Sequence, residues 1–191
     1  MIDIIHPEQR ILYMKVGVHA REPLDKIFER KNREIEQAGY TFWGYGGNTC
    51  HPTTKVQPFA RDAEKADSKI FLCMEEIESK HYAEPVRANQ FSIDGLVWND
   101  IHEAIDVVGS RFALAIKDLH YEEMDLPMEK VEVAIGECEG RTGANYIKGR
   151  VDKACLRLRH DIGAPIAEGE RVVKINLLAE MCAPYAVFLK N

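Results

Sequence analysis

Long apolar runs are missing from the sequence, and its most apolar stretch spans only residues 112–116. A helix that crosses a membrane needs about 20 consecutive apolar residues, so we expect no membrane partner. The opening residues, Met1-Ile-Asp-Ile-Ile-His-Pro, carry an acid at position 3 and lack the apolar centre of a secretory signal. The sequence therefore predicts a cytoplasmic location.

Paired cysteines and nucleotide-binding motifs are missing as well. The cysteines are five in number and none forms a Cys-x-x-Cys pair; they stand at positions 50, 73, 138, 155 and 182. A disulfide framework or a structural zinc site needs closely spaced pairs, so we expect reduced thiols and no metal site. Neither Gly-x-x-x-x-Gly-Lys-Ser/Thr nor Gly-x-Gly-x-x-Gly occurs, and no cofactor is predicted.

The sequence also lacks a surplus of positive charge. The chain holds 25 Lys and Arg against 31 Asp and Glu, which gives a formal net charge of −6. Duplex DNA and anionic membranes are bound through a dominant positive field, so we do not expect duplex DNA as a partner. The hydrophobic fraction of 46% excludes a disordered chain, and the length of 191 residues predicts a single globular domain over 1–191.

The apolar periodicity predicts an α+β fold. Residues 11–18 alternate between apolar and polar side chains, as a half-buried strand does, and a helical stripe from Leu24 to Ile35 follows, ended by Gly39. Further strands are expected over 40–43, 69–77, 91–98, 111–121, 131–135, 172–178 and 185–189.

Helices are expected to be few. The sequence predicts a long ordered loop over 48–58, one or two helical turns over 59–66, and a helix over 151–158, although a strand also fits the last segment. Because most strands follow one another without a crossover helix, we expect a mixed, mostly antiparallel sheet with two or three helices. The opening strand–helix–strand predicts one parallel pair.

The most unusual segment, residues 43–51, is named the aromatic loop. Large rings and glycines alternate in it, and Trp43 and Tyr45 offer stacking surfaces to a planar ligand, whereas Asn48 and His51 can read the ligand's edges through hydrogen bonds. The alternative interpretation is that these rings are ordinary core residues around a tight turn.

A second glycine-rich stretch, residues 136–150, is named the second glycine segment. Its cations Arg141, Lys148 and Arg150, with Lys153 just beyond, reverse the local charge of an acidic chain. Backbone amides and cations together suit an anion. The alternative is a solvated hairpin whose charges serve only solubility. The sequence does not show whether this segment and the aromatic loop share a pocket.

These two segments suggest a ligand-binding module. We expect it to bind a planar anionic, nucleotide-like small molecule or the end of a single-stranded nucleic acid. One alternative is a small hydrolase or transferase that uses His51 or Cys50 with a carboxylate. The other is a homo-oligomeric scaffold, a homodimer among its forms, in which the rings make an interface. Lys15 and His19 flank the end of the first strand, where they matter only if they face a pocket.

Overall fold

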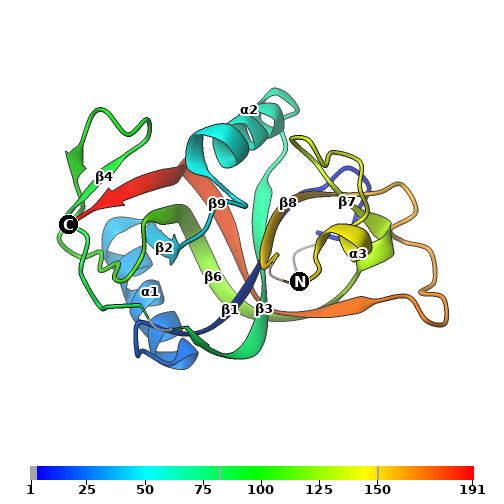
Figure 1. Cartoon of the computed structure of the whole chain (residues 1–191), viewed down its shortest axis with the longest axis horizontal. Helices are drawn as coiled ribbons and strands as arrows, with labels where there is room; N and C mark the ends of the chain where they lie inside the picture. The colour runs from blue at the N-terminus through cyan, green and yellow to red at the C-terminus, as the bar shows by residue number, and fades with distance from the viewer. Residues whose placement is uncertain (1–3, 82, 150) are drawn as a thin grey trace.

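The computed structural model describes residues 4–81, 83–149 and 151–191, and nine strands within these ranges form one mixed sheet (Figure 1). The strands are β1 (Arg10–His19), β2 (Thr41–Tyr45), β3 (Ile70–His81), β4 (Gln90–Ser92), β5 (Asn99–Asp100), β6 (Phe112–Pro127), β7 (Val131–Val133), β8 (Lys153–Leu158) and β9 (Val172–Lys190). The helices are α1 (Leu24–Ala38), α2 (Gln57–Lys65) and α3 (Gly143–Tyr146), with a π-helical turn at Pro52–Val56 and a 3-10 turn at Met128–Lys130.

The sheet runs in the order β2-β6-β9-β3-β1-β8-β7, with β4 added beside β9 and β5 beside β4. Among the described strands only β1 and β3 pair in parallel. The α+β class with a mostly antiparallel sheet is therefore confirmed. The parallel pair expected between the strands on either side of the first helix is wrong, since β1 pairs in parallel with β3, whereas β2 pairs with β6 at the far side of the sheet.

The segment 151–158 shows where apolar spacing misleads. It forms the strand β8, so the helix expected there is wrong and the alternative of a strand is right. Cys155 packs in the core on one face of the sheet, and Ala154 and Leu156 pack in the core on the other. Because both faces of β8 are buried here, apolar residues occupy the consecutive positions 154–156 and hide the two-residue period of a strand.

Two other expectations change at prolines. The loop predicted over 48–58 gives way at Pro52 to a π-helical turn that continues into α2, since proline is well tolerated in the first turn of a helix. The short helix expected over 59–66 is confirmed as α2. At the chain's end, the two strands expected on either side of Pro184 are one strand, β9, with residues 182–185 bulged out of its ladder with β6.

Among the described residues, buried apolar side chains form three clusters, and the two largest lie on opposite faces of the sheet. The first core, packed beneath α1 and α2, takes side chains from the even positions of β1, such as Leu12 and Met14, and the rings of Trp43 and Tyr45. The second core takes the odd positions, such as Ile11 and Tyr13. In the described part of the chain, no helix is both long and apolar enough to cross a membrane.

Candidate ligand-binding site

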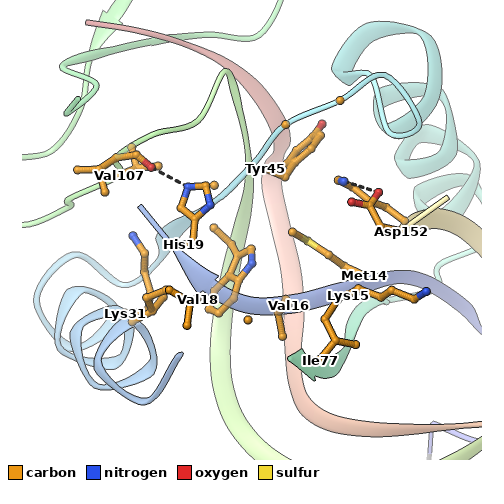
Figure 2. Close-up of a pocket in the computed structure, with 18 of the residues that line it drawn as sticks. Met14, Lys15, Val16, Val18, His19, Lys31, Tyr45, Ile77, Val107 and Asp152 are labelled. Atoms are coloured by element: carbon orange, nitrogen blue, oxygen red, sulfur yellow. Dashed lines mark hydrogen bonds and ion pairs between the residues drawn. The ribbon is translucent and has the colours of Figure 1, made fainter. Parts of the chain in front are cut away.

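A cavity of about 490 Å³ lies on the face of the sheet that carries the first core. We name it the ring cavity; its walls come from the end of β1, from α1, from β2 with the residues after it, from segment 106–108 and from the start of β8. Figure 2 shows His19 toward one end and Asp152 toward the other, with Met14 and Val16 between them. The sheet thus curls enough to bring β2 and β8, distant in strand order, to one cavity.

The apolar walls are set by strand register. Antiparallel pairing of β2 with β6 opposes Trp43 to Leu114 and Tyr45 to Phe112. Because side chains alternate along a strand, both rings point into the first core, where their exposed fractions are only 4% and 1%. The Tyr45 hydroxyl donates a hydrogen bond to the backbone oxygen of Cys50, which closes the aromatic loop on itself.

Gly44, between the two rings, allows a close approach by the segment that leads into β6. A Cβ atom at this position would lie 2.9 Å from the Cβ of Ser110 and 3.2 Å from a methyl group of Val107. Real Cβ atoms do not approach other carbons so closely in a packed interior. The glycine therefore lets segment 106–110 lie against β2 and complete the cavity wall.

An ion pair between a buried lysine and a half-exposed aspartate forms one polar end of the ring cavity. Lys153 pairs with Met14 across β8 and β1, which places its side chain on the cavity face, and the residue is only 5% exposed. Its ammonium lies 2.6 Å from Oδ1 of Asp152. The backbone amide of Lys15 donates to the backbone oxygen of Asp152 at 2.8 Å, so the ladder fixes this end of the cavity.

His19 forms the other polar end. Its Nε2 lies 3.1 Å from the backbone oxygen of Val108 and 3.2 Å from Oγ of Ser110. A carbonyl oxygen only accepts hydrogen bonds, so this contact assigns the proton to Nε2 in the neutral ring. His19 therefore ties the end of β1 to the segment that forms the opposite wall.

Two cations of α1 reach the same wall but are already engaged. The Lys31 ammonium donates to Oε2 of Glu34 at 2.8 Å and to the backbone oxygen of Asp106 at 2.7 Å. Burial lowers the pKa of Lys31 to about 8, against the opposing attraction of Glu34. Arg30 forms ion pairs with Glu22 and Glu34. These cations hold segment 106–108 against α1 and are neutralised by carboxylates.

The structure separates the residues that the sequence had grouped in the aromatic loop. Trp43 and Tyr45 line the ring cavity, whereas Asn48 is exposed and lines neither this cavity nor a second, smaller one described below. His51 also lies elsewhere, with Nδ1 3.3 Å from Oγ1 of Thr53 and its ring packed edge-on against Phe112.

Two of the predicted cations of the second glycine segment lie outside the ring cavity. Arg141 and Lys148 are exposed, and the Lys148 ammonium contacts Oδ1 of Asn145 at 3.3 Å. Arg150 is outside the described residues. From this basic stretch of the chain, it is Lys153 that reaches the ring cavity.

The two glycine-rich segments do meet, at a second cavity of about 180 Å³. We name it the thiol cavity; its lining includes Thr49 and Lys55, Cys138 and Tyr146 of the second glycine segment, and Cys155 of β8. Cys50 is fully buried and interacts with Cys155, while its neighbour His51 turns to Thr53. Among the described residues no group of three or more His, Cys, Asp or Glu side chains is arranged to hold a metal ion.

Several residues of the ring cavity were not predicted as site residues, and they differ in whether the sequence offered a feature that could have identified them. His19 carried a weak signal, since it ends an alternating strand, and Lys153 belonged to the basic stretch. Lys31 and Asp106 carried none, because their contact joins α1 to a loop far along the chain. Comparison of the chain with protein family models, with curated proteins and with solved structures found no match.

Proposed function

We propose that the ring cavity binds a small planar anionic ligand of the nucleotide class. The observation that carries the proposal is the presence, in one cavity, of two aromatic side chains and the buried ammonium of Lys153. Trp43 and Tyr45 provide apolar surface for a planar ring system. Lys153 provides a positive charge whose attraction for an anion is strengthened by its removal from water.

The size and chemistry of the cavity support a small molecule. Its volume of about 490 Å³ lies within the range of roughly 300–1,000 Å³ that small-molecule sites occupy. Such sites combine apolar walls with a few fixed polar groups, and here Met14 and Val16 lie between the polar ends at His19 and Asp152.

The cations favour a small molecule over the end of a nucleic-acid strand. A strand continues out of its pocket and needs a basic track for its phosphates. The exposed Arg141 and Lys148 do not line the ring cavity, and its charged rim includes Asp152 and Asp106. A single anionic group at Lys153, which competes with Asp152 for the ammonium, matches this arrangement better.

The proposal includes a cytoplasmic setting, which the five free cysteines support. We assign no reaction to the ring cavity. The hydrolase alternative gains no observation in its favour, since Cys50 is fully buried and His51 lines neither cavity. The scaffold alternative gains none from the rings, because Trp43 and Tyr45 are buried within the molecule.

The proposal is tested by measuring thermal unfolding and titration calorimetry with four probes: adenosine monophosphate, uridine monophosphate, adenosine and inorganic phosphate. A nucleotide at a hundred times its Kd stabilises the folded state by about 2.7 kcal/mol, which raises the unfolding midpoint by about 5–10 °C in a chain of this size. Adenosine and phosphate each satisfy only one half of the site and are expected to bind at least about tenfold more weakly.

Two lysine variants locate the binding. Lys153→Met keeps the length of the side chain but removes the charge, and it is expected to weaken nucleotide binding by about tenfold or more. Lys148→Met removes an exposed cation from the same stretch of sequence and is the matched control, with unchanged affinity. If no probe binds, or if both variants lose affinity equally, the proposal is wrong. Binding of a short single-stranded oligonucleotide but of no mononucleotide would also overturn it.

A further inference from the structure

The Lys153 ammonium lies beside the turn that follows β2. Gly47 in this turn adopts a φ of 82°, and a Cβ atom built on it would lie 3.9 Å from Nζ of Lys153. Gly46, Gly47 and Lys153 all line the ring cavity. A buried cation and a glycine turn that are far apart in the sequence therefore meet at one end of this cavity.

The same turn offers backbone hydrogen-bond donors. The ladder of β2 with β6 ends at Tyr45, and within the part of the chain that the structure describes no protein atom accepts a hydrogen bond from the backbone amides of residues 46–49. A Cβ atom at Gly46 would meet nothing within 4 Å, so a ligand can approach this backbone closely. Amides of a turn beside a cation are a combination that suits phosphate oxygens.

Asp152 occupies one side of the Lys153 ammonium, at the end of the cavity away from His19 (Figure 2). Its Oδ1 accepts a hydrogen bond from that ammonium at 2.6 Å, yet the aspartate side chain is 49% exposed, whereas Lys153 is buried. Because the aspartate reaches solvent, another anion can replace its carboxylate at the ammonium without leaving either charge buried and unpaired. Lys153 then keeps an anionic partner in both states.

The other cations on the cavity wall are committed elsewhere. Arg30 and Lys31 both form ion pairs with Glu34. Lys15 stands at an odd position of β1, and the odd positions of this strand point to the face of the second core. Each phosphate added to a first one would therefore bring negative charge close to Asp152 without a new cationic partner.

We propose that the ring cavity takes a nucleoside monophosphate, whose phosphate binds between the Lys153 ammonium and the Gly46–Gly47 turn in place of the Asp152 carboxylate. The place of the phosphate and the limit to one phosphate both rest on the nucleotide-binding function proposed above. With the phosphate at the Asp152 end, the base extends toward His19 (Figure 2). Asp152 disfavours diphosphates and triphosphates, because its carboxylate repels the added charge.

Titration calorimetry with adenosine monophosphate, diphosphate and triphosphate tests the limit to one phosphate. The buffer contains a chelator, so that no divalent cation neutralises the added phosphates. The wild type is expected to bind the monophosphate at least about tenfold more tightly than the other two nucleotides.

The variant Asp152→Asn tests whether this carboxylate sets the limit. It keeps an oxygen that can face the Lys153 ammonium but removes the negative charge. Affinity for the monophosphate should therefore rise about fivefold, and affinity for the triphosphate should rise by more. Glu139→Gln removes an exposed negative charge that lines neither cavity, and as the matched control it should leave both affinities unchanged.

The variant Gly47→Ala tests the place of the phosphate. Its methyl group would lie 3.9 Å from the Lys153 ammonium, in the space assigned to the phosphate, and should weaken monophosphate binding at least about tenfold. Gly140→Ala is the matched control, since Gly140 has a φ of 80°, open space around it and no part in either cavity. Both substitutions strain a backbone of positive φ, so similar unfolding midpoints would separate a loss of binding from a loss of folding.

The outcomes distinguish the failure of the phosphate site from the failure of nucleotide binding. If no adenine nucleotide binds, both are wrong. If the monophosphate binds and Lys153→Met weakens it, but the triphosphate binds as tightly or Gly47→Ala binds like the wild type, nucleotide binding stands and the phosphate site is wrong. A lower affinity for the monophosphate in Asp152→Asn would also overturn the phosphate site, because the carboxylate would then help to hold the ligand.

Discussion

In the aromatic loop the rings of Trp43 and Tyr45 are buried and Gly44 makes room for a neighbouring segment, whereas in the second glycine segment Arg141 and Lys148 are exposed and Gly140 turns the backbone. Trp43 and Tyr45 lie in the first core with Gly44 packed against Ser110. Gly140, at a φ of 80°, instead has open space around it, and the adjacent Arg141 is exposed. The two glycine-rich segments therefore differ in where their characteristic side chains lie: the rings are in the core and the cations are in water.

The difference follows from hydrogen bonding to the sheet. The aromatic loop begins within β2, where Trp43, Gly44 and Tyr45 pair with β6, so the alternation of the strand dictates which of these side chains enter the core. The second glycine segment turns back on β7 through hydrogen bonds of Gly140 and Arg141 with Val133, but it forms only an isolated bridge there and no strand of its own. Its cations are free to remain in water, which is the favourable place for an unpaired charge.

The largest expected effect on stability comes from adding a methyl group at Gly44, which tests whether this glycine makes room for segment 106–110. In Gly44→Ala the new carbon meets the Cβ of Ser110 and a methyl group of Val107, and such overpacking costs about 2–3 kcal/mol. Urea denaturation, monitored by tryptophan fluorescence, is expected to show a lower midpoint with an unchanged slope.

Gly46→Ala is the matched control within the same loop. A Cβ atom there meets nothing within 4 Å, so the free energy of unfolding should stay within about 1 kcal/mol of the wild type. Equal losses in the two variants would mean that glycine in this loop is needed for backbone freedom rather than for the close approach of segment 106–110.

Much of the fold could be predicted from the sequence, because one-sided burial leaves a period. β1 alternates and α1 carries a stripe ended by Gly39, which adopts a φ of 80°. At β8 the apolar pattern did not distinguish a strand from a helix, because both faces of this strand are buried. The partner of β1 was equally hidden, since pairing with β3 is decided by packing across the sheet and not by local pattern.

The candidate site was predictable only in part, and the reason is geometric. Aromatic residues in a glycine-rich strand end pointed to Trp43 and Tyr45, and both line the ring cavity. Local charge density pointed to Arg141 and Lys148, but a cluster of cations carries no information about direction. Lys153 reaches the cavity because the β1–β8 register places it beside Met14, and that register is a long-range property.

A subtler test contrasts the buried Lys31, which contacts Thr41 at the start of β2, with the exposed Lys148. The pKa of Lys31 is lowered to about 8 in the folded protein, and lysine in an unfolded chain titrates near 10.4. Between these values the unfolded chain binds more protons, so the contribution of Lys31 to stability rises with pH.

Denaturant unfolding of the wild type and of Lys31→Met measures this contribution. From about pH 7.5 to about pH 9 the wild type should gain about 1 kcal/mol relative to the variant. Thiols and phenols that titrate in the same range are common to both proteins and cancel in the difference. Lys148→Met should show no change over the same interval, and a flat difference for Lys31→Met would mean that this amine remains protonated throughout.

The smallest expected effect concerns the exposed cations of the second glycine segment. Arg141→Ala combined with Lys148→Ala removes two charges that lie in water, and neither side chain forms an ion pair among the described residues. Exposed substitutions of this kind change the free energy of unfolding by no more than about 0.5 kcal/mol. Calorimetric unfolding should therefore give nearly the wild-type midpoint. A loss above about 1 kcal/mol would show that these cations stabilise the segment, and the contrast with the aromatic loop would then be one of degree.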